Sequence, residues 1–391
     1  MHYDFDKPVE RRGSGAVKFD ALGPHYGRED LLPMWVADMD FETPDFVVEA
    51  LRRRLGHPIF GYTVEPEGYR PSIVAWQRRR HGWEIRPEWL AYIPGIVKGI
   101  GLVVDRFTRP GDRIVVQPPI YHPFHLLPRA NDREVVWNPL RETAEGYEMD
   151  FEGLERLLSA GGCRLLLLAN PHNPAGIAWD AATLRRLAAL CAAHGVVVVS
   201  DEIHADMALF GHRHTPFASV SDEAARLSIT FAAPSKSFNI AGIVSSYAIV
   251  PDEALRRRFF GWLAANEFDS PALFAPIATE AAYRHGDAWL DAMLRYVEGN
   301  VRLVEEFCCE RLPGIRPVRP QASFLVWLDC RPLGLAHGRL VSLFVDGARL
   351  ALNDGAMFGP GGEGFMRLNV GTQRARLEEA LRRLERALER M

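Results

Sequence analysis

Two apolar runs in the middle of the chain restrict its fold more than any other feature. Residues 165–169 and 196–199 contain no polar side chain, as expected for strands of a parallel sheet that is covered on both faces. Between them, Asp180 precedes a segment with apolar residues at helical spacing, and Gly195 ends it. A strand, a helix and a strand in this order form a right-handed βαβ unit. The sequence therefore predicts a parallel sheet flanked by helices.

The same alternation extends through residues 112–232, and a different pattern follows. It predicts strands at 113–117, 134–138 and 227–232 and a helix at 151–160. From residue 287 a long helix with one apolar face runs to Leu312, where Pro313 and Gly314 end it. Shorter strand-like runs and a charged terminal helix then indicate a smaller α+β region, with strands at 323–328, 349–353 and 365–370. We expect a large α/β domain at 45–286 and a small domain made of 1–44 and 287–391.

Composition excludes several classes of protein. A net charge of −4 over 391 residues gives no basic surface for nucleic acid. The five cysteines have no C-x-x-C spacing, which argues against a disulfide framework and a zinc site, and we expect no metal. The N-terminus lacks an apolar signal region, and no run of about 18 apolar residues occurs. We therefore expect a cytoplasmic protein that contacts no membrane.

Three polar residues follow strand ends of the predicted sheet. Asn173 follows the strand at 165–169, Asp201 the one at 196–199 and Lys236 the one at 227–232. Carboxyl ends of parallel strands meet at one edge of a sheet, where ligands bind. The alternatives are a turn-forming asparagine, a helix-capping aspartate and a surface amine. Together, however, an amine, a carboxylate and an amide are the groups that pyridoxal phosphate requires.

Gly95 offers a possible seat for the phosphate of such a cofactor. It lies between an extended segment and an apolar helix that reaches Phe107. A glycine at a helix start leaves free N–H groups that point at an anion. Many strand-to-helix turns contain glycine, so this signal is weak when taken alone.

Five longer motifs resemble those of a known family. They are residues 34–41 (MWVADMDF), 118–124 (PPIYHPF), 200–204 (SDEIH), 235–242 (SKSFNIAG) and 365–369 (FMRLN). With these runs the chain resembles the fold-type-I pyridoxal-phosphate enzymes of the aspartate aminotransferase superfamily, and within them the MalY/PatB group of cystathionine β-lyases. The resemblance implies a mostly parallel seven-stranded sheet in the large domain, a smaller α+β domain, and a homodimer with active sites at its interface.

The resemblance also implies roles for individual residues. Lys236 would bind the cofactor covalently and then remove the substrate Cα proton, and Asp201 would pair with the ring nitrogen. Asn173 and, less firmly, His204 would contact the phenolic oxygen. Tyr121 would stack on the ring, and its alternative is a turn tyrosine in the core. Lys236, Asp201 and Tyr121 are the catalytic residues that follow from the resemblance.

The implied phosphate site departs from the family pattern. Its members would be Gly95, Ile96, Val97, Ser235 and, from a second subunit, Tyr62. Ala233 stands where many relatives have a serine on the phosphate, and Val244 where many aminotransferases have an arginine. Backbone N–H groups and Tyr62 would then carry more of the binding.

The substrate would be an amino acid. By the resemblance, Arg367 would hold its α-carboxylate with two parallel hydrogen bonds, and Tyr121, Trp35 and Asp38 would line the rest of the pocket. A surface role for Arg367 and a loop-capping role for Asp38 are the alternatives. The reaction implied is α,β-elimination from L-cystathionine or a related L-cysteine S-conjugate, giving pyruvate, ammonia and a thiol. An aminotransferase, or a lyase with an added regulatory partner, remain alternatives, and the preferred thiol stays open.

Overall fold

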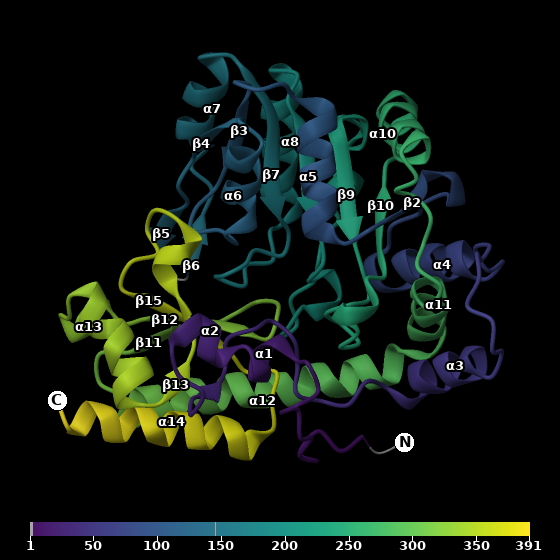
Figure 1. The fold of residues 1–391 in the computed structure, drawn as a ribbon. Coiled ribbons are helices and arrows are strands. Elements are labelled where there is room, and N and C mark those ends of the chain that lie inside the picture. The colour runs from purple at the N-terminus through teal and green to yellow at the C-terminus, as the bar shows by residue number, and fades with distance from the viewer. Residues whose placement is uncertain (1–2, 145) are drawn as a thin grey trace.

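A seven-stranded sheet forms the centre of the large part of the molecule (Figure 1). The computed structural model describes residues 3–144 and 146–391. The strand order is β2-β10-β9-β8-β7-β3-β4. Their bounds are β2 (Leu90–Ile93), β3 (Arg113–Val116), β4 (Glu134–Trp137), β7 (Cys163–Ala169), β8 (Val197–Asp201), β9 (Ser228–Ala232) and β10 (Ser246–Ile249). Within this sheet β10 alone runs against its neighbours. The predicted seven-stranded, mostly parallel sheet is confirmed.

Alternating leucines explain why β7 lies in the interior of this sheet, between β8 and β3. Leu165 and Leu167 pack into the core on one face, and Leu166 and Leu168 into the core on the other. All four are almost completely buried, and each such side chain contributes about 1.5–3 kcal/mol by leaving water. A strand with two apolar faces is stable only between two layers of helices.

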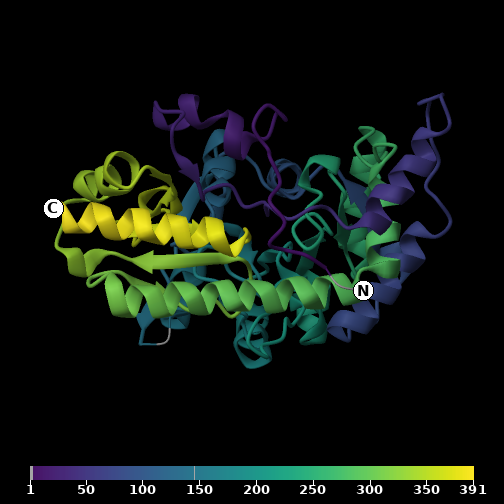
Figure 2. The same cartoon turned by 90° about the horizontal axis from the view of Figure 1, so that it is seen from below.

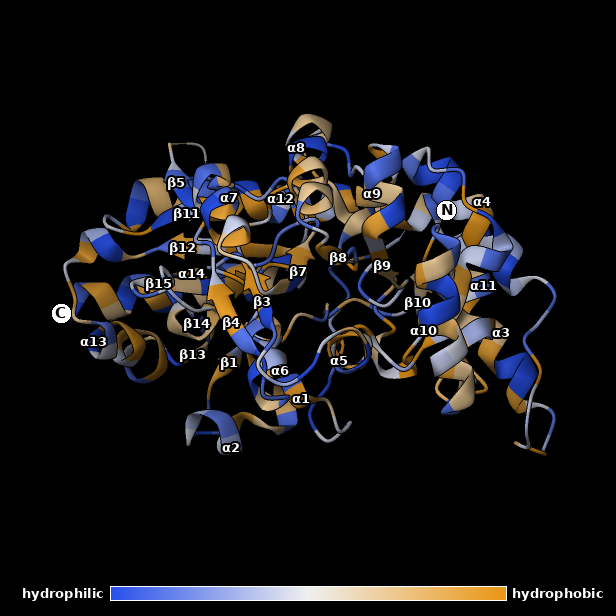
Figure 3. Ribbon diagram, turned by 90° about the horizontal axis from the view of Figure 1, so that it is seen from above, coloured by the Kyte–Doolittle hydropathy of each residue, from blue (hydrophilic) through white to orange (hydrophobic). Residues whose placement is uncertain are grey.

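Six helices supply these two layers. The first face is covered by α5 (Ile96–Phe107), α6 (Pro123–Ala130) and α10 (Glu253–Ala265), and the second by α7 (Phe151–Ser159), α8 (Ala181–Ala193) and α9 (Asp222–Leu227). Figure 3 shows the same division, with apolar residues on the strands and on inward-facing helix surfaces. The predicted cap of α8 is confirmed, because the Asp180 side chain accepts a hydrogen bond from the Thr183 N–H at 2.7 Å.

The smaller sheet is antiparallel and lies on two long helices. Its order is β11 (Arg316–Val318), β12 (Leu325–Asp329), β15 (Phe365–Asn369) and β14 (Asn353–Asp354). Helices α12 (Asp287–Arg311) and α14 (Arg374–Glu389) run side by side beneath it (Figure 2). The long helix predicted from residue 287 is thus confirmed.

Two predictions of local structure were wrong in detail. Residues 349–353 do not form one strand: β13 (Leu350–Ala351) pairs with β1 (Leu32–Pro33), while β14 joins the smaller sheet. The pair Thr43 and Pro44 predicts the N-cap and first position of a helix that ends near Gly56, but Thr43 does not cap α3 (Asp45–Leu55), because its hydroxyl donates instead to the Asn239 carbonyl at 3.1 Å. The β1 pairing attaches the N-terminal segment to the smaller part, and the domain bounds themselves stay a prediction.

The remaining elements surround this framework. They are α1 (Val17–Asp20), α2 (Leu22–Tyr26), α4 (Tyr69–His81), α11 (Ala275–His285), α13 (His337–Ser342) and the hairpin β5 (Arg141–Thr143) and β6 (Gly146–Glu148). Residues 1–30 contain glycine, proline and mixed charges with little periodicity, so the two short N-terminal helices were not predicted. Among the described helices, none combines the length and the apolar character that crossing a bilayer requires.

Candidate active site

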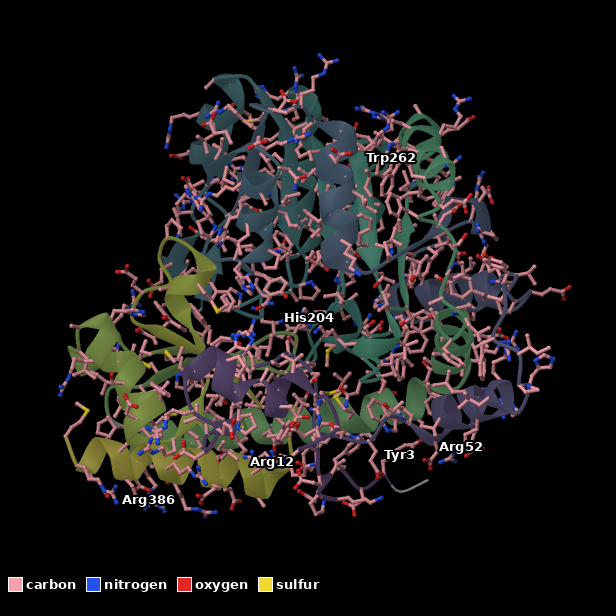
Figure 4. All side chains as sticks on the ribbon, viewed as in Figure 1. Tyr3, Arg12, Arg52, His204, Trp262 and Arg386 are labelled. Atoms are coloured by element: carbon pink, nitrogen blue, oxygen red, sulfur yellow. The ribbon has the colours of Figure 1, made fainter. Side chains whose placement is uncertain are left out.

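A cavity of about 290 Å³ lies at the carboxyl ends of the central strands. Every residue predicted to bind the cofactor lines it except Tyr62: Gly95, Ile96, Val97, Tyr121, Asn173, Asp201, His204, Ser235 and Lys236. His204 marks its position in Figure 4, between the large sheet and the layer of α12. The topology therefore brings together side chains that are far apart in sequence.

Lys236 enters the cavity from a turn after β9. It is half-buried, and its Nζ donates a hydrogen bond to the Ala37 carbonyl. Burial lowers the pKa of Lys236 to about 8; Arg367 adds to this effect, and the carboxylates of Asp38 and Asp201 oppose it. A substantial share of the amine is therefore neutral near physiological pH, as nucleophiles and bases require.

Asp201 is the last residue of β8 and lies at the bottom of the same cavity. One carboxylate oxygen accepts a hydrogen bond from the Ile203 N–H at 3.1 Å. Burial raises the pKa of Asp201 to about 7, while this hydrogen bond and the Lys236 charge act in the opposite direction. A cationic nitrogen placed beside it would favour the ionised carboxylate. The site thus offers a buried carboxyl suited to pairing with a protonated ring nitrogen.

His204 presents an unpaired polar atom in the cavity wall. Its Nδ1 is buried without a hydrogen-bond partner among the described residues. Burial lowers the pKa of His204 to about 3, helped by the charges of Lys236 and Arg367, so the imidazole is neutral. A buried polar atom without a partner is costly, and a ligand oxygen or nitrogen would remove that cost.

Arg367 projects from β15 of the smaller sheet and is 3% exposed. Its Nη1 donates to Asn173 Oδ1 at 3.0 Å, and its Nη2 to Asn353 Oδ1 at 2.6 Å and the Trp35 carbonyl at 3.2 Å. Its Nε has no partner, and no carboxylate in the described part of the chain forms an ion pair with it. Burial lowers the pKa of Arg367 to about 10, which leaves it charged at neutral pH. A buried guanidinium without a counterion is a binding site for an anion.

The start of α5 forms the other end of the cavity. Gly95 has φ of 110°, a conformation that side chains disfavour, and it lines the cavity together with Ile96 and Val97, the first residues of α5. Val244 lies beside it: a Cβ added at Gly95 would meet Val244 Cγ1 at 3.7 Å. Val244 itself has φ of 57°, which is strained for a β-branched residue. An anion bound here would therefore meet backbone N–H groups and not a guanidinium at position 244.

Four predicted site residues do not line the cavity, and Arg367, which contacts Asn173 of its wall, is one of them. Tyr62 is fully exposed on the α3–α4 connection, which extends away from the body of the molecule (Figure 2). The Trp35 ring packs edge-on against Tyr26 at 5.4 Å, so only its carbonyl reaches Arg367. Asp38 pairs with Arg11 at 2.8 Å. The N-terminal segment supplies these partners, and its structure had not been predicted.

The sequence did not predict several other residues that shape the active site. The Ala37 carbonyl and the Asn353 side chain hold Lys236 and Arg367, and no sequence pattern signals either of them. Asn239 belongs to the motif at 235–242, and no individual role was predicted for it. It has φ of 56°, and its Nδ2 donates to the carbonyls of Met39 at 2.9 Å and Phe41 at 2.7 Å. A polar residue three positions after the lysine was the available signal.

Comparisons with known proteins agree over nearly the whole chain. A family model described as "Aminotransferase class I and II" matches residues 29–384. Cystathionine beta-lyase PatB of Bacillus subtilis is 46% identical over 385 residues, which are 98% of this chain and 100% of PatB. Protein MalY of Escherichia coli is 32% identical over 388 residues, 99% of each protein.

A solved structure agrees as closely with the fold. The crystal structure of cystalysin from Treponema denticola, which contains a pyridoxal 5'-phosphate cofactor, matches with a TM-score of 0.96 and 31% identity over 100% of both chains. The predicted resemblance is thus confirmed, and the chain belongs to the class I and II aminotransferase family, in the group that contains PatB and MalY.

Proposed function

We propose that this protein is a pyridoxal-phosphate-dependent carbon–sulfur β-lyase. It cleaves L-cystathionine or a related L-cysteine S-conjugate to pyruvate, ammonia and a thiol, which is homocysteine when the substrate is cystathionine. The observation that carries the proposal is one cavity lined by a lysine with a pKa of about 8 and a buried carboxyl, with an uncompensated buried guanidinium at its edge. The similarity to PatB, a named cystathionine beta-lyase, supports the reaction.

The residues of the cavity fit the cofactor. Lys236 would hold it, Asp201 would pair with its ring nitrogen, and the unpartnered His204 and Asn173 would meet its phenolic oxygen. The N–H groups after Gly95 would receive its phosphate. When bound, pyridoxal phosphate supplies an aldehyde that reacts with the substrate amine and a ring that withdraws electrons from the substrate Cα.

The chain's own groups would then orient the substrate and move its proton. Arg367 binds the α-carboxylate through its free Nε and one terminal nitrogen, and this fixes which Cα bond faces Lys236. The neutral amine of Lys236 takes the Cα proton. Burial raises the pKa of Tyr121, so its phenol stays protonated beside the substrate. The β C–S bond breaks and the thiolate departs with the bonding electron pair, and the 2-aminoacrylate that is released reacts with water to give pyruvate and ammonia.

Product analysis tests the reaction. Purified protein is incubated with L-cystathionine without any keto acid, and pyruvate and free thiol are measured. We expect equal amounts of both, and none from Lys236→Ala. Turnover that requires a keto-acid acceptor and releases no thiol would show an aminotransferase instead. That alternative is supported by the family name, but no arginine that could bind a second substrate carboxylate lines the cavity in the described residues.

We further propose a homodimer. The α3–α4 connection exposes Ile59, Phe60, Tyr62 and Val64 to between 59% and 112%. Four large apolar side chains on one projecting loop are unusual for a free surface, and a second subunit would cover them while Tyr62 reaches its cavity. Location in the cytoplasm and a part in methionine biosynthesis through homocysteine are expectations of the same proposal.

A further inference from the structure

The cavity has an anion seat but little positive charge beside it. The N–H groups at the start of α5 adjoin Ser235, Ser246 and Val244. Two ammonium groups and no guanidinium belong to the described residues that line the cavity. One of them, Lys236, hydrogen-bonds to Ala37 on the N-terminal segment. The other belongs to Lys98.

Lys98 has the position and the freedom to bind an anion at this seat. It stands in the first turn of α5, next to Ile96 and Val97, and it lines the cavity while its side chain is exposed. In the described residues its ammonium has no hydrogen bond or ion pair. The surface of this chain is otherwise rich in arginine, since only four of its 46 basic residues are lysines. An unpaired lysine at a helix start beside a cavity therefore calls for an explanation.

We propose that Lys98 binds the phosphate monoester of the cofactor and supplies the positive charge that Val244 does not. The inference rests on the proposed function. A phosphate monoester carries about 1.5–2 negative charges at pH 7, more than the half charge of a helix N-terminus balances. A compact, flexible ammonium is a suitable partner for phosphate.

The experiment measures binding, so activity is not needed as a readout. Apoproteins of the wild type, Lys98→Met and Lys98→Arg are titrated with pyridoxal phosphate and with pyridoxal, which has the same aldehyde and ring but no phosphate. Uptake is followed by visible absorbance. Lys7→Met, which removes an exposed surface ammonium paired with Glu42, is the matched control.

We expect Lys98→Met to weaken binding of pyridoxal phosphate about tenfold or more, the effect of losing a charged hydrogen bond. Its affinity for pyridoxal should not change. Lys98→Arg should retain most of the affinity, and Lys7→Met all of it. Competition by inorganic phosphate against coenzyme uptake should weaken in parallel in Lys98→Met.

Two results would overturn the inference. One is an unchanged affinity of Lys98→Met for pyridoxal phosphate, and the other is an equal loss for both ligands, which would mean general damage to the cavity. Either leaves the proposed function standing as long as the wild type binds the coenzyme. A wild type that binds neither ligand would reject the proposed function and the role of Lys98 with it.

Discussion

The ammonium of Lys236 donates a hydrogen bond to the backbone carbonyl of Ala37, which lies 199 residues earlier in the chain. The segment around Ala37 is itself fixed, because Asn369 Nδ2 donates to the carbonyls of Val36 at 2.6 Å and Asp38 at 2.7 Å. The lysine is thereby held against the N-terminal segment by a contact with no charged acceptor. Its pKa is lowered by burial, and the contact with Ala37 fixes the position of the amine.

The first prediction concerns pH. Uptake of pyridoxal phosphate by the apoprotein requires the neutral amine of Lys236, so its rate should rise with pH through a midpoint near 8. Asp38→Asn removes a carboxylate that raises this pKa and should move the midpoint down. Arg367→Met removes a cation that lowers it and should move the midpoint up. Stopped-flow absorbance at several pH values measures all three, and a common midpoint above pH 10 would contradict the assignment.

The second prediction separates substrate binding from cofactor binding. Arg367→Lys keeps the charge but loses the planar fork, so KM for cystathionine should rise about 10–100-fold. Affinity for pyridoxal phosphate should stay within about twofold, since Arg367 is not assigned to the cofactor. Steady-state kinetics give KM for cystathionine, and absorbance titration gives the affinity for pyridoxal phosphate. Arg316→Lys, at the exposed first position of β11, is the control, and an unchanged KM in Arg367→Lys would exclude the carboxylate role.

The third prediction concerns a buried ion pair. Lys18 Nζ lies 3.0 Å from Asp40 Oδ2, and both side chains are 0% exposed. Lys18→Met leaves the Asp40 carboxylate with Arg11 as its remaining ion-pair partner, and should lower the free energy of unfolding by about 3 kcal/mol. Lys7→Met breaks the exposed pair with Glu42 and should cost less than about 1 kcal/mol. Urea denaturation measures both, and equal losses would show that burial does not matter here.

The contribution of the Lys18–Asp40 pair to the stability of the fold depends on pH. Burial alone would raise the pKa of Asp40, but the charges of Lys18 and Arg376 and its hydrogen bonds hold it below its ordinary value. A carboxyl with a lowered folded-state pKa contributes stability above its unfolded pKa of about 3.9, and this is lost as pH falls. The difference in the free energy of unfolding between the wild type and Lys18→Met should therefore shrink as pH is lowered from about 5 toward 2.

The fourth prediction tests whether two subunits share a site. Tyr62→Ala should weaken phosphate binding, and Lys236→Ala should abolish turnover. Mixed dimers of the two variants contain one site with an intact Lys236 and an intact Tyr62 from the neighbour. After unfolding and refolding of an equal mixture, about a quarter of wild-type activity should return. If activity stays at the level of Tyr62→Ala alone, Tyr62 does not act across an interface.

Most of the helices and strands could be predicted from local sequence patterns. The leucines of β7 specify a strand buried on both faces because successive side chains alternate between faces. Asp180 specifies the start of α8 because its cap lies only three residues away. The order of the strands was not predicted, but the polar residues after the strand ends gathered at one cavity, as parallel strands with a shared carboxyl edge require.

Contacts between distant segments could not be predicted. The sequence around Lys18 is typical of an exposed terminal segment, yet the Lys18 side chain is fully buried against Asp40. The Ala37 contact uses a backbone carbonyl, which every residue possesses, so no residue type announces it. The motif at 34–41 contains Ala37, whose carbonyl accepts from Lys236, but the directions of the Trp35 and Asp38 side chains depended on partners from the N-terminal segment.

Arg367 belongs to β15 of the smaller sheet, whereas Lys236 follows β9 of the larger one. A bound amino acid that contacts both residues connects the two sheets through its carboxylate and its Cα. This connection exists only while the ligand is bound, so the two sheets should move least relative to each other during the reaction. Departure of the last fragment, which keeps the carboxylate, removes this connection and leaves the contacts within the chain, such as that of Arg367 Nη1 with Asn173 Oδ1.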